Sequence, residues 1–400
     1  MKNKESLQRL EIAQQQVLFR VLYQIGSLIF FPYYYIRLYK TTGSLSIIFL
    51  ESLVFFISLW AAFTIFTFII DKNGYLKSYR LSFIIQAIAF GAVFIFLDQI
   101  EELYIIFAIL VGFGRGTFWP IYHGASLKEF QGIRRGKLID INESIIQILS
   151  ILLPIMAGAV IGFSNQGLRI IILIYISIIL TAVLYPWKYN KKPRNKIRSS
   201  EITAIFKKKH FKRYFWIMFF EAGVSRFMGS LFLVIPYILI GNEFGVGGLA
   251  TLTGIVAAVG SFSERNLDIK YKTPIAYFVY ILSGIGTLLL GIIWTVPMLA
   301  IRSLIVNLRS SLGSTLYAEL NYKVKEKLLG DFKDESALEM NLIDETIAML
   351  GRVFALILSY FFITEVKDIE IVLKSGLIIF AFYPLLSFTL SKKLNDKLKK

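Results

Sequence analysis

The sequence contains no cysteine and only two histidines among its 400 residues. The first absence excludes disulfides, thiolate metal ligands and a cysteine nucleophile, and two histidines are too few for a histidine metal cluster. Charged residues are also scarce, at 18%, while hydrophobic residues make up 56% and the mean hydropathy is +0.63. This composition is too apolar for a soluble protein, and it indicates an integral membrane protein.

Long apolar runs recur along the whole chain, separated by short polar breaks. A helix needs about 20 apolar residues to cross the hydrocarbon core of a bilayer. The sequence therefore predicts an all-α protein with twelve transmembrane helices. Their approximate spans are 16–36, 47–70, 81–98, 103–123, 140–163, 169–187, 214–240, 247–263, 274–293, 296–320, 339–363 and 370–391.

The net charge of +17 comes from 44 lysines and arginines, most of which lie in alternate loops. Cytoplasmic loops are enriched in these residues, so the pattern places both termini in the cytoplasm and the protein in the cell membrane. The stretch before the first apolar run has no small-residue cleavage site after it, which predicts an uncleaved first helix. A nucleic-acid partner is not expected, because the basic loops are short and carry no interleaved aromatic residues.

The longest polar stretch, 188–213, divides the predicted helices into two groups of six. We therefore expect an N-terminal six-helix bundle over 1–187, a basic cytoplasmic linker over 188–213 and a C-terminal six-helix bundle over 214–400. Internal similarity supports two related halves: GSLIFFPY (26–33) resembles GSLFLVIPY (229–237), and INESIIQILS (141–150) resembles IDETIAMLGR (343–352). Such repeats are typical of secondary transporters.

Three short motifs add a family resemblance. DKNGYLK (71–77) is similar to the loop signature between helices 2 and 3 of the major facilitator superfamily, and RRGK (134–137) resembles the loop before helix 5 of that family. LLPIMAG (152–158) resembles the helix 5 signature of its antiporter branches, although leucine and alanine replace two glycines. Together with the layout of six plus six helices, the chain resembles a transporter of this superfamily over its whole length.

The resemblance implies roles for two of these motifs. Asp71, Lys72 and Gly74 would form a conformational latch between the two halves at the cytoplasmic side, with the glycine allowing a tight turn. The alternative is that the charges are only solvated loop residues. Pro154 and Gly158 are expected to bend helix 5 or to let it pack closely against a neighbour.

Arginines within the predicted spans are the strongest candidates for a binding site. Arg115, Arg226 and Arg309 lie near the middle of their spans, where a charge is costly unless it meets a partner or a polar cavity. The resemblance places all three on helices that line the central pathway, with Arg115 and Arg309 facing each other. Trp119 and Tyr122 follow Arg115 at helical spacing and predict a shared face suited to an anionic or amphipathic ligand.

The alternative for these arginines is pairing with protein carboxylates, which would only hold helices together. Among the carboxylates, Glu221 is the candidate for a proton carrier, whereas Glu51 and several others lie close to predicted helix ends. The aromatic run FFPYYY (30–35) predicts a belt at the membrane interface.

The sequence thus predicts a secondary active transporter that moves a small anionic or amphipathic solute by alternating access, as an antiporter or exporter. One alternative is a proton-coupled multidrug exporter of lipophilic compounds, for which Glu221 should matter more than the arginines. Another is a membrane scaffold or sensor that keeps the fold without transport. An enzyme is not expected, because no nucleophile or acid pair stands out within the spans. We expect no cofactor or metal, a proton or another anion as the counter-transported ion, and a monomer in the lipid bilayer.

Overall fold

A computed structural model describes residues 2–129, 133–184, 199–208, 210–265, 269–329, 337–366 and 368–397. Within these ranges all regular structure is helical. The first group of helices is α1 (Lys2–Ile29), α2 (Phe31–Thr42), α3 (Leu45–Asn73), α4 (Tyr75–Phe96), η1 (Leu97–Gln99), α5 (Ile100–Gly116), α6 (Phe118–Glu129), α7 (Ile133–Phe163) and α8 (Gly167–Leu184). The second is α9 (Ser199–Phe206), α10 (Phe211–Ile240), α11 (Glu243–Arg265), α12 (Ile269–Ile292), α13 (Val296–Leu329), α14 (Ala337–Glu365), α15 (Ile369–Phe380) and α16 (Tyr383–Lys397).

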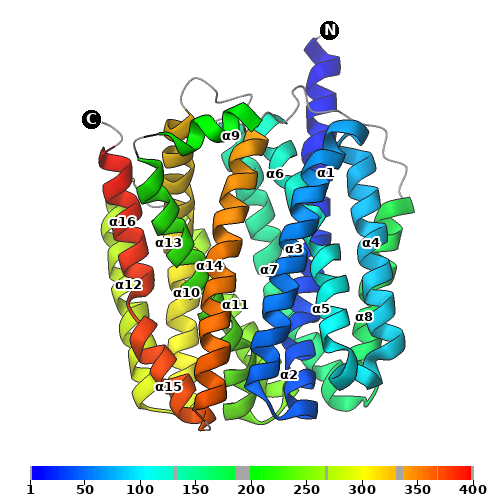
Figure 1. Ribbon diagram of the computed structural model, residues 1–400, viewed down its shortest axis with the longest axis vertical. Helices are drawn as coiled ribbons and strands as arrows, with labels where there is room; N and C mark the ends of the chain where they lie inside the picture. The colour runs from blue at the N-terminus through cyan, green and yellow to red at the C-terminus, as the bar shows by residue number, and fades with distance from the viewer. Residues whose placement is uncertain are drawn as a thin grey trace.

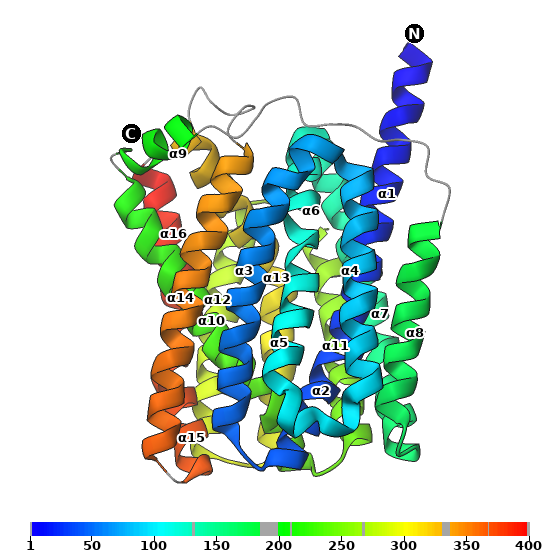
Figure 2. The same ribbon diagram turned by 45° about the vertical axis from the view of Figure 1, so that its right-hand side comes forward.

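The long helices stand upright and side by side, and both chain ends lie at the same end of the molecule (Figures 1 and 2). We call this the terminal end and the other the distal end. The short helix α9 lies across the terminal end, within the predicted linker. Residues 185–198, which include the first part of the linker's basic stretch, lie outside the described residues.

Ten segments of the described residues are helical, long and apolar enough to cross a membrane. One of them, Tyr75–Ala125, is 51 residues long and contains α4 and α5, which lie side by side and are joined through η1 at the distal end. The segment α13 is not among the ten, although it runs alongside the others. Its arginines and its polar second half lower its hydropathy.

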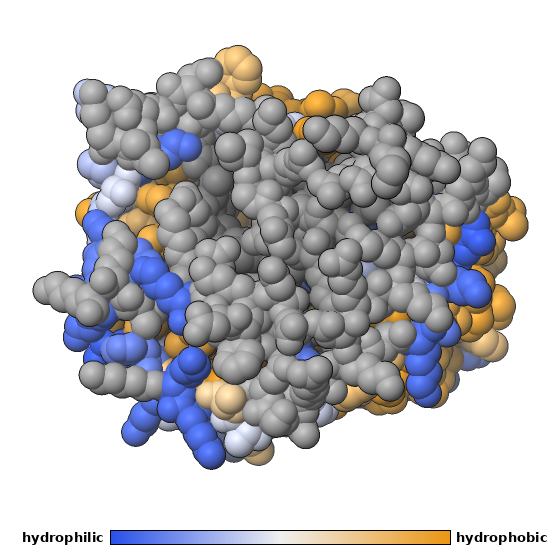
Figure 3. All heavy atoms as spheres, turned by 90° about the horizontal axis from the view of Figure 1, so that it is seen from above, coloured by the Kyte–Doolittle hydropathy of each residue, from blue (hydrophilic) through white to orange (hydrophobic). Residues whose placement is uncertain are grey.

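Large hydrophobic side chains cover the flanks of the bundle. Residues such as Ile88, Phe163 and Phe278 are 63 to 88% exposed on helices from different parts of the chain. Figure 3 views the molecule from the terminal end, where hydrophilic side chains gather at the rim and hydrophobic ones appear along the flanks. Apolar surface of this extent is expected where lipid tails replace water.

Three of the upright helices are interrupted. The breaks fall at Phe30 between α1 and α2, at Thr117 between α5 and α6, and between α15 and α16. A proline lies within the first turn after each break, where its missing N–H costs no helical hydrogen bond. In the related sequence of the second half, Pro236 stays inside the continuous helix α10, so the two copies of this motif have different backbones.

Glycines allow α5 to pack directly on the backbone of α3. A Cβ atom built on Gly112 would lie 2.4 Å from the carbonyl oxygen of Phe55, and one on Gly116 would lie 2.1 Å from that of Leu59. Gly114 points to the other side, toward Gln86 of α4. These small residues therefore set the spacing between helices, as is common in membranes.

Two helix pairs make the most extensive contacts between the halves of the chain. Helix α7 packs along α11, where a Cβ on Gly254 would lie 2.9 Å from the carbonyl oxygen of Ser150. Helix α3 packs along α14, and Trp60 Nε1 donates a hydrogen bond to Thr346 Oγ1 at 3.1 Å. We call these two contacts the seams. They bring together helices from different halves of the chain.

The predicted aromatic belt at residues 30–35 is wrong. Tyr33, Tyr34 and Tyr35 are each at most 2% exposed. The break at Phe30 turns α2 inward, and Tyr33 Oη donates a hydrogen bond to the carbonyl oxygen of Pro154 in α7 at 2.5 Å. These tyrosines therefore belong to the interior near the distal end.

Candidate functional site

Arg115 lies near the end of α5 and is only 2% exposed. Its Nη1 atom donates hydrogen bonds to the backbone oxygen of Tyr23 at 2.8 Å and to Tyr175 Oη at 3.1 Å, and its Nη2 atom donates to Ser27 Oγ. Its Cζ atom is 3.2 Å from the centroid of the Tyr23 ring. Neutral oxygens and an aromatic face thus surround this charge, which places Arg115 inside the first half, against α1 and α8.

Trp119 and Tyr122 lie beyond the break at Thr117, on α6. The Tyr23 ring connects them to Arg115, because its centroid is 5.2 Å from that of Trp119. The Cζ atom of Arg20 lies 4.6 Å from the centroid of the Trp119 ring and 5.5 Å from that of Tyr122. Cation–π contacts of this kind favour a cation where water is scarce.

Arg20 was therefore missed in the sequence analysis. The signal was present, because this arginine falls within the predicted span 16–36, near its start rather than near its middle. In the structure it shares one aromatic cluster with Trp119 and Tyr122 at the terminal end of the first half. The cluster combines a cation with large apolar rings.

Arg309 makes its contacts within the second half. Its Nη1 atom donates a hydrogen bond to Ser283 Oγ of α12 at 3.3 Å, and its Cζ atom is 5.6 Å from the centroid of the Tyr280 ring. The expected face-to-face arrangement of Arg115 and Arg309 is therefore not seen in their contacts. Each guanidinium instead turns toward hydroxyl groups and a tyrosine ring of its own half.

Arg302 lies on the same face of α13 as Arg309, and its surroundings are similar. Its Nε atom donates a hydrogen bond to Thr287 Oγ1 at 3.4 Å, and its Cζ atom lies 3.3 Å from the centroid of the Phe232 ring. Helix α13 thus carries two positive charges into the second half, both held by neutral groups among the described residues.

Glu221 is half-buried on α10. Its Oε2 atom accepts a hydrogen bond from Ser387 Oγ of α16 at 3.2 Å, and it lies within electrostatic range of Arg309 and Lys325. All of these groups belong to the second half of the chain. Changing the charge on Glu221 would therefore act first within that half.

Arg226 differs from Arg115, Arg302 and Arg309 because it reaches across the two halves. From α10, its Nη2 atom donates a hydrogen bond to Ser52 Oγ of α3 at 3.0 Å. Its Cζ atom lies 4.4 Å from the centroid of the Phe56 ring, also on α3. Glu51, next to Ser52, is only 2% exposed and lies within electrostatic range of Arg226.

The placing of Glu51 corrects the sequence analysis, which set this residue aside as a helix-end charge. Glu51 is the seventh residue of α3, near the start of that helix. Helices α2 and α10 cover this part of α3 and bury the side chain. Periodicity in a membrane helix cannot distinguish a lipid-facing from a protein-facing position near an end, because both sides are apolar.

The predicted latch is described only in part. Gly74 caps α3 with a positive φ of 78°, a conformation that favours glycine, and Lys72 is exposed beside it. The side chain of Asp71 lies outside the described residues, as do the side chains of RRGK (134–137). The turn is therefore seen, while the ion pairs expected of the latch are not described.

Pro154 and Gly158 lie in α7 at its seam with α11. A Cβ atom on Gly158 would lie 2.8 Å from the carbonyl oxygen of Glu243, and one on Gly247 would lie 2.6 Å from that of Pro154. Helix α7 continues through Pro154 as one helix. The motif thus lies where the two helices approach most closely, rather than beside the buried arginines.

A bundle of long apolar helices with buried cations defines a polytopic membrane protein with a polar interior. The family model described as Major Facilitator Superfamily matches residues 17–325. The chain therefore belongs to the major facilitator superfamily, whose members are transporters, and is a multi-pass membrane protein. No curated protein matches the sequence.

Solved structures with the same fold have very different sequences. The human organic anion transporter MFSD10 (TETRAN) superposes with a TM-score of 0.66 at 9% identity, covering 96% of this chain and 99% of the other. The nucleoside transporter NupG gives 0.67 at 12% identity, with 97% and 99% covered. A bacterial homologue of the human lysosomal transporter Spinster, inward-facing and unoccupied, gives 0.62 at 13% identity, with 100% and 98% covered.

Proposed function

We propose that the protein is a secondary active transporter of a small anionic or amphipathic solute, working by alternating access in the cell membrane. It has twelve transmembrane helices in two bundles, 1–187 and 214–400, joined by the basic linker 188–213, and the terminal end is cytoplasmic. The distribution of basic loops supports this orientation. The protein acts as a monomer, without a cofactor or metal.

The observation that carries the anion proposal is the positive charge inside the bundle. Arg115, Arg226, Arg302 and Arg309 contact hydroxyls, backbone oxygen and aromatic rings, and none forms an ion pair within 4.0 Å of a described carboxylate. Arg115 is buried and the other three are half-buried. A cation inside the bundle without an ion-pair contact is costly, because low dielectric strengthens every unbalanced charge. An anionic substrate group would supply the missing charge, and guanidinium binds carboxylate or phosphate through two parallel hydrogen bonds.

Within this proposal Arg115, Arg226 and Arg309 bind the anionic group, and Trp119 with Tyr122 contacts the apolar part of the substrate. Such an arrangement suits an amphipathic anion better than an inorganic ion. Among the superposed structures one is an organic anion transporter, which is compatible with this substrate class.

Other parts of the chain have conformational roles in the proposal. Asp71, Lys72 and Gly74 form the latch at the cytoplasmic side, and Pro154 with Gly158 lets α7 slide or rock against α11. The helix 5 motif favours export, in exchange for protons or another anion. Glu221 is a proton carrier within the C-terminal bundle.

A multidrug exporter of lipophilic compounds is the second candidate. The aromatic cluster of Tyr23, Phe118, Trp119 and Tyr122 favours it, because these rings contact one another, stacked or edge to face, at centroid distances of 4.2 to 6.1 Å. Such a surface also accepts neutral and cationic lipophiles. This candidate predicts that removing Glu221 harms transport more than removing any arginine.

Uptake into proteoliposomes separates the candidates. The panel contains organic carboxylates, phosphate esters and lipophilic cations, each tested with and without a pH gradient. We expect anion uptake that falls at least tenfold in Arg115→Met and Arg309→Met, and persists in Arg37→Met, whose arginine is exposed on α2.

Two outcomes would contradict the anion proposal. Uptake of lipophilic cations that depends on Glu221 and tolerates both arginine substitutions would favour the multidrug exporter. No uptake of any compound by correctly folded protein would favour a scaffold or sensor that keeps the fold.

A further inference from the structure

A polar cluster lies buried between the two halves, on the distal side of the bundle's middle. We call it the interface cluster, and its members are Tyr34 and Tyr35 of α2, Glu51 and Ser52 of α3, Arg226 of α10 and Arg352 of α14. It brings one acidic group from the first half against two cations from the second. The sequence alone does not bring these residues together, since they lie far apart in the chain.

Glu51 is incompletely satisfied in this cluster. Its side chain is 2% exposed, and its Oε2 atom has no hydrogen-bond partner. The hydroxyl of Tyr34, which lies nearby on α2, also lacks one. A buried carboxylate with an open oxygen is expensive when ionised, and much less so when it carries a proton.

Arg226, on the second half, also has an unused hydrogen-bonding group. Its Nη2 atom is bound to Ser52 Oγ, whereas its Nε atom has no hydrogen-bond partner. No oxygen of Glu51 comes within the 4.0 Å that defines an ion pair with Arg226, although each lies in the electrostatic range of the other. Glu51 and Arg226 are therefore neighbours that do not form an ion pair.

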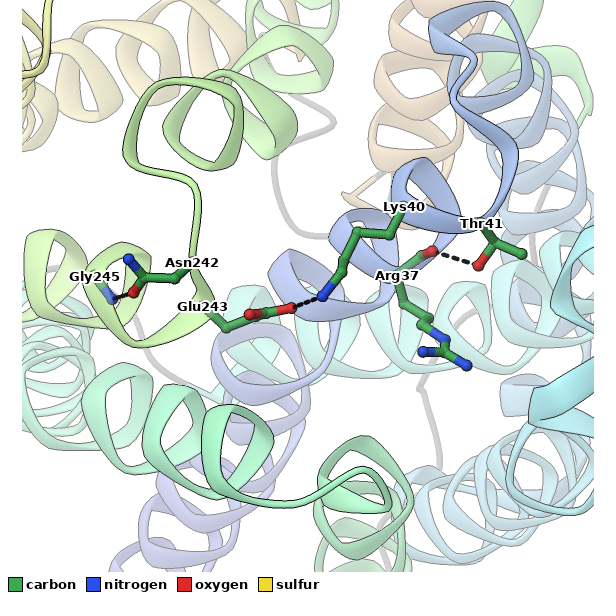
Figure 4. Close-up of polar contacts among 6 residues, drawn as sticks. All are labelled: Arg37, Lys40, Thr41, Asn242, Glu243 and Gly245. Atoms are coloured by element: carbon green, nitrogen blue, oxygen red, sulfur yellow. Dashed lines mark hydrogen bonds and ion pairs between the residues drawn. The ribbon is translucent and has the colours of Figure 1, made fainter.

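Other acid–base pairs near the interface cluster are in direct contact as ion pairs, whereas Glu51 and Arg226 are not. Arg352 Nη1 and Glu345 Oε1 are 2.6 Å apart within α14. At the distal end, Lys40 Nζ of α2 and Glu243 Oε1 of α11 are 2.7 Å apart and link the two halves, as Figure 4 shows. The fold therefore brings other ion pairs together, and leaves Glu51 and Arg226 within electrostatic range of each other without an ion pair.

We propose that Glu51 and Arg226 form a proton-controlled pair between the two bundles, in which Arg226 binds the substrate anion when Glu51 is protonated. When Glu51 is ionised, it attracts Arg226 across the interface, holds the bundles together on the distal side and competes with an anion. Protonation removes that attraction and leaves Arg226 without a counter-charge. One proton is then taken up with each anion bound, so coupling through Glu51 moves proton and anion in the same direction and takes the place of the proton exchange and of the Glu221 carrier described above.

The surroundings favour this assignment over Glu221. Glu51 faces Tyr34 and Tyr35 from α2, Arg226 from α10 and, through Phe56, Arg352 from α14. Its charge state therefore acts directly on a contact between the halves. Glu221 acts only on groups of the second half, so it has no direct means of linking a proton to bundle movement.

The absence of cysteine gives a direct test that needs no substrate. Gln99 and Thr295 are exposed at the distal end, one in each half, so Gln99→Cys with Thr295→Cys accepts exactly two spin labels. The distance between the labels is measured by pulsed electron paramagnetic resonance in lipid nanodiscs at about pH 5 and about pH 8, the range over which a perturbed carboxyl group titrates.

We expect the distance distribution to change between the two pH values in this labelled protein. The change should disappear in Glu51→Gln, which keeps the side-chain shape, and return with a different midpoint in Glu51→Asp. Glu370→Gln is the matched control, because its carboxylate is paired with Lys374 on α15, outside the interface cluster, and it should leave the response intact. Elution from a sizing column and the melting temperature show that each variant is folded.

A pH response that survives in Glu51→Gln, or that is absent from the parent protein, would overturn the proposal. The part that concerns the anion rests on the proposed function and is read separately in proteoliposomes. There, an inward proton gradient should accelerate uptake of an organic carboxylate in the parent protein and not in Glu51→Gln. If no anion is transported while the label distance still depends on pH through Glu51, the proposed function is wrong and the proposed Glu51–Arg226 pair is retained.

Discussion

Replacing Gly116 by alanine tests the close contact between α5 and α3. The added Cβ atom would lie 2.1 Å from the carbonyl oxygen of Leu59, whereas ordinary contacts begin at 3.4 Å, so the two helices must separate by about 1.3 Å. Overpacking of this kind costs about 1 to 3 kcal/mol. The same substitution at Gly91 of α4, where nothing lies within 4 Å, should instead gain up to about 1 kcal/mol of helix propensity.

The assay is the melting temperature of the purified protein in one detergent, followed by tryptophan fluorescence. We expect Gly116→Ala to lower Tm and Gly91→Ala to leave it unchanged or raise it. Both positions receive the same methyl group, so the added hydrophobicity is matched, although Gly116 is the last residue of α5 and Gly91 lies inside α4. If the two variants shift Tm in the same direction and by the same amount, the direct backbone contact between α5 and α3 is refuted.

Three further predictions concern polar contacts. Lys40→Glu and Glu243→Lys should each weaken the contact between the halves at the distal end, and the double exchange should restore it. Because the ion pair is partly exposed, we expect it to contribute about 0.2 to 1 kcal/mol to this contact. The measurement is the distance distribution between spin labels at positions 99 and 295. A distance unaffected by either single variant would contradict this. Tyr33→Phe should lower stability by about 0.5 to 1.5 kcal/mol through loss of its hydrogen bond to α7, measured as Tm; an unchanged Tm would show that this bond contributes nothing. Arg115→Met should raise the KM for an organic carboxylate at least tenfold in proteoliposomes, while Arg37→Met should not; equal KM values in both would exclude Arg115 from binding.

The sequence was sufficient to find the helices. Apolar runs of about 20 residues have few alternatives in a bilayer, and every predicted span overlaps a helix of the structure. The breaks at Phe30 and Thr117 were not predicted, although Pro32 and Pro120 lie just after them. Pro154 and Pro236 show why, since a proline in a membrane helix need not interrupt it.

The candidate site was only partly within reach of the sequence. A charge inside an apolar span is conspicuous, which is how Arg115, Arg226 and Arg309 were found. Their partners were not, because hydroxyls, backbone oxygens and tyrosine rings leave no distinct sequence signal. Glu51 was missed for a related reason, since its burial depends on α10, which lies more than 150 residues further along the chain.

The central claim is that buried arginines bind a substrate anion during transport. The most direct measurement is the transient current from proteoliposomes on a solid-supported membrane after a concentration jump of an organic carboxylate. We predict a current for carboxylates and phosphate esters that is lost in Arg226→Met and in Arg115→Met, and retained in Arg37→Met. A current that appears only with lipophilic cations, or one that survives both buried-arginine substitutions unchanged, would contradict the account.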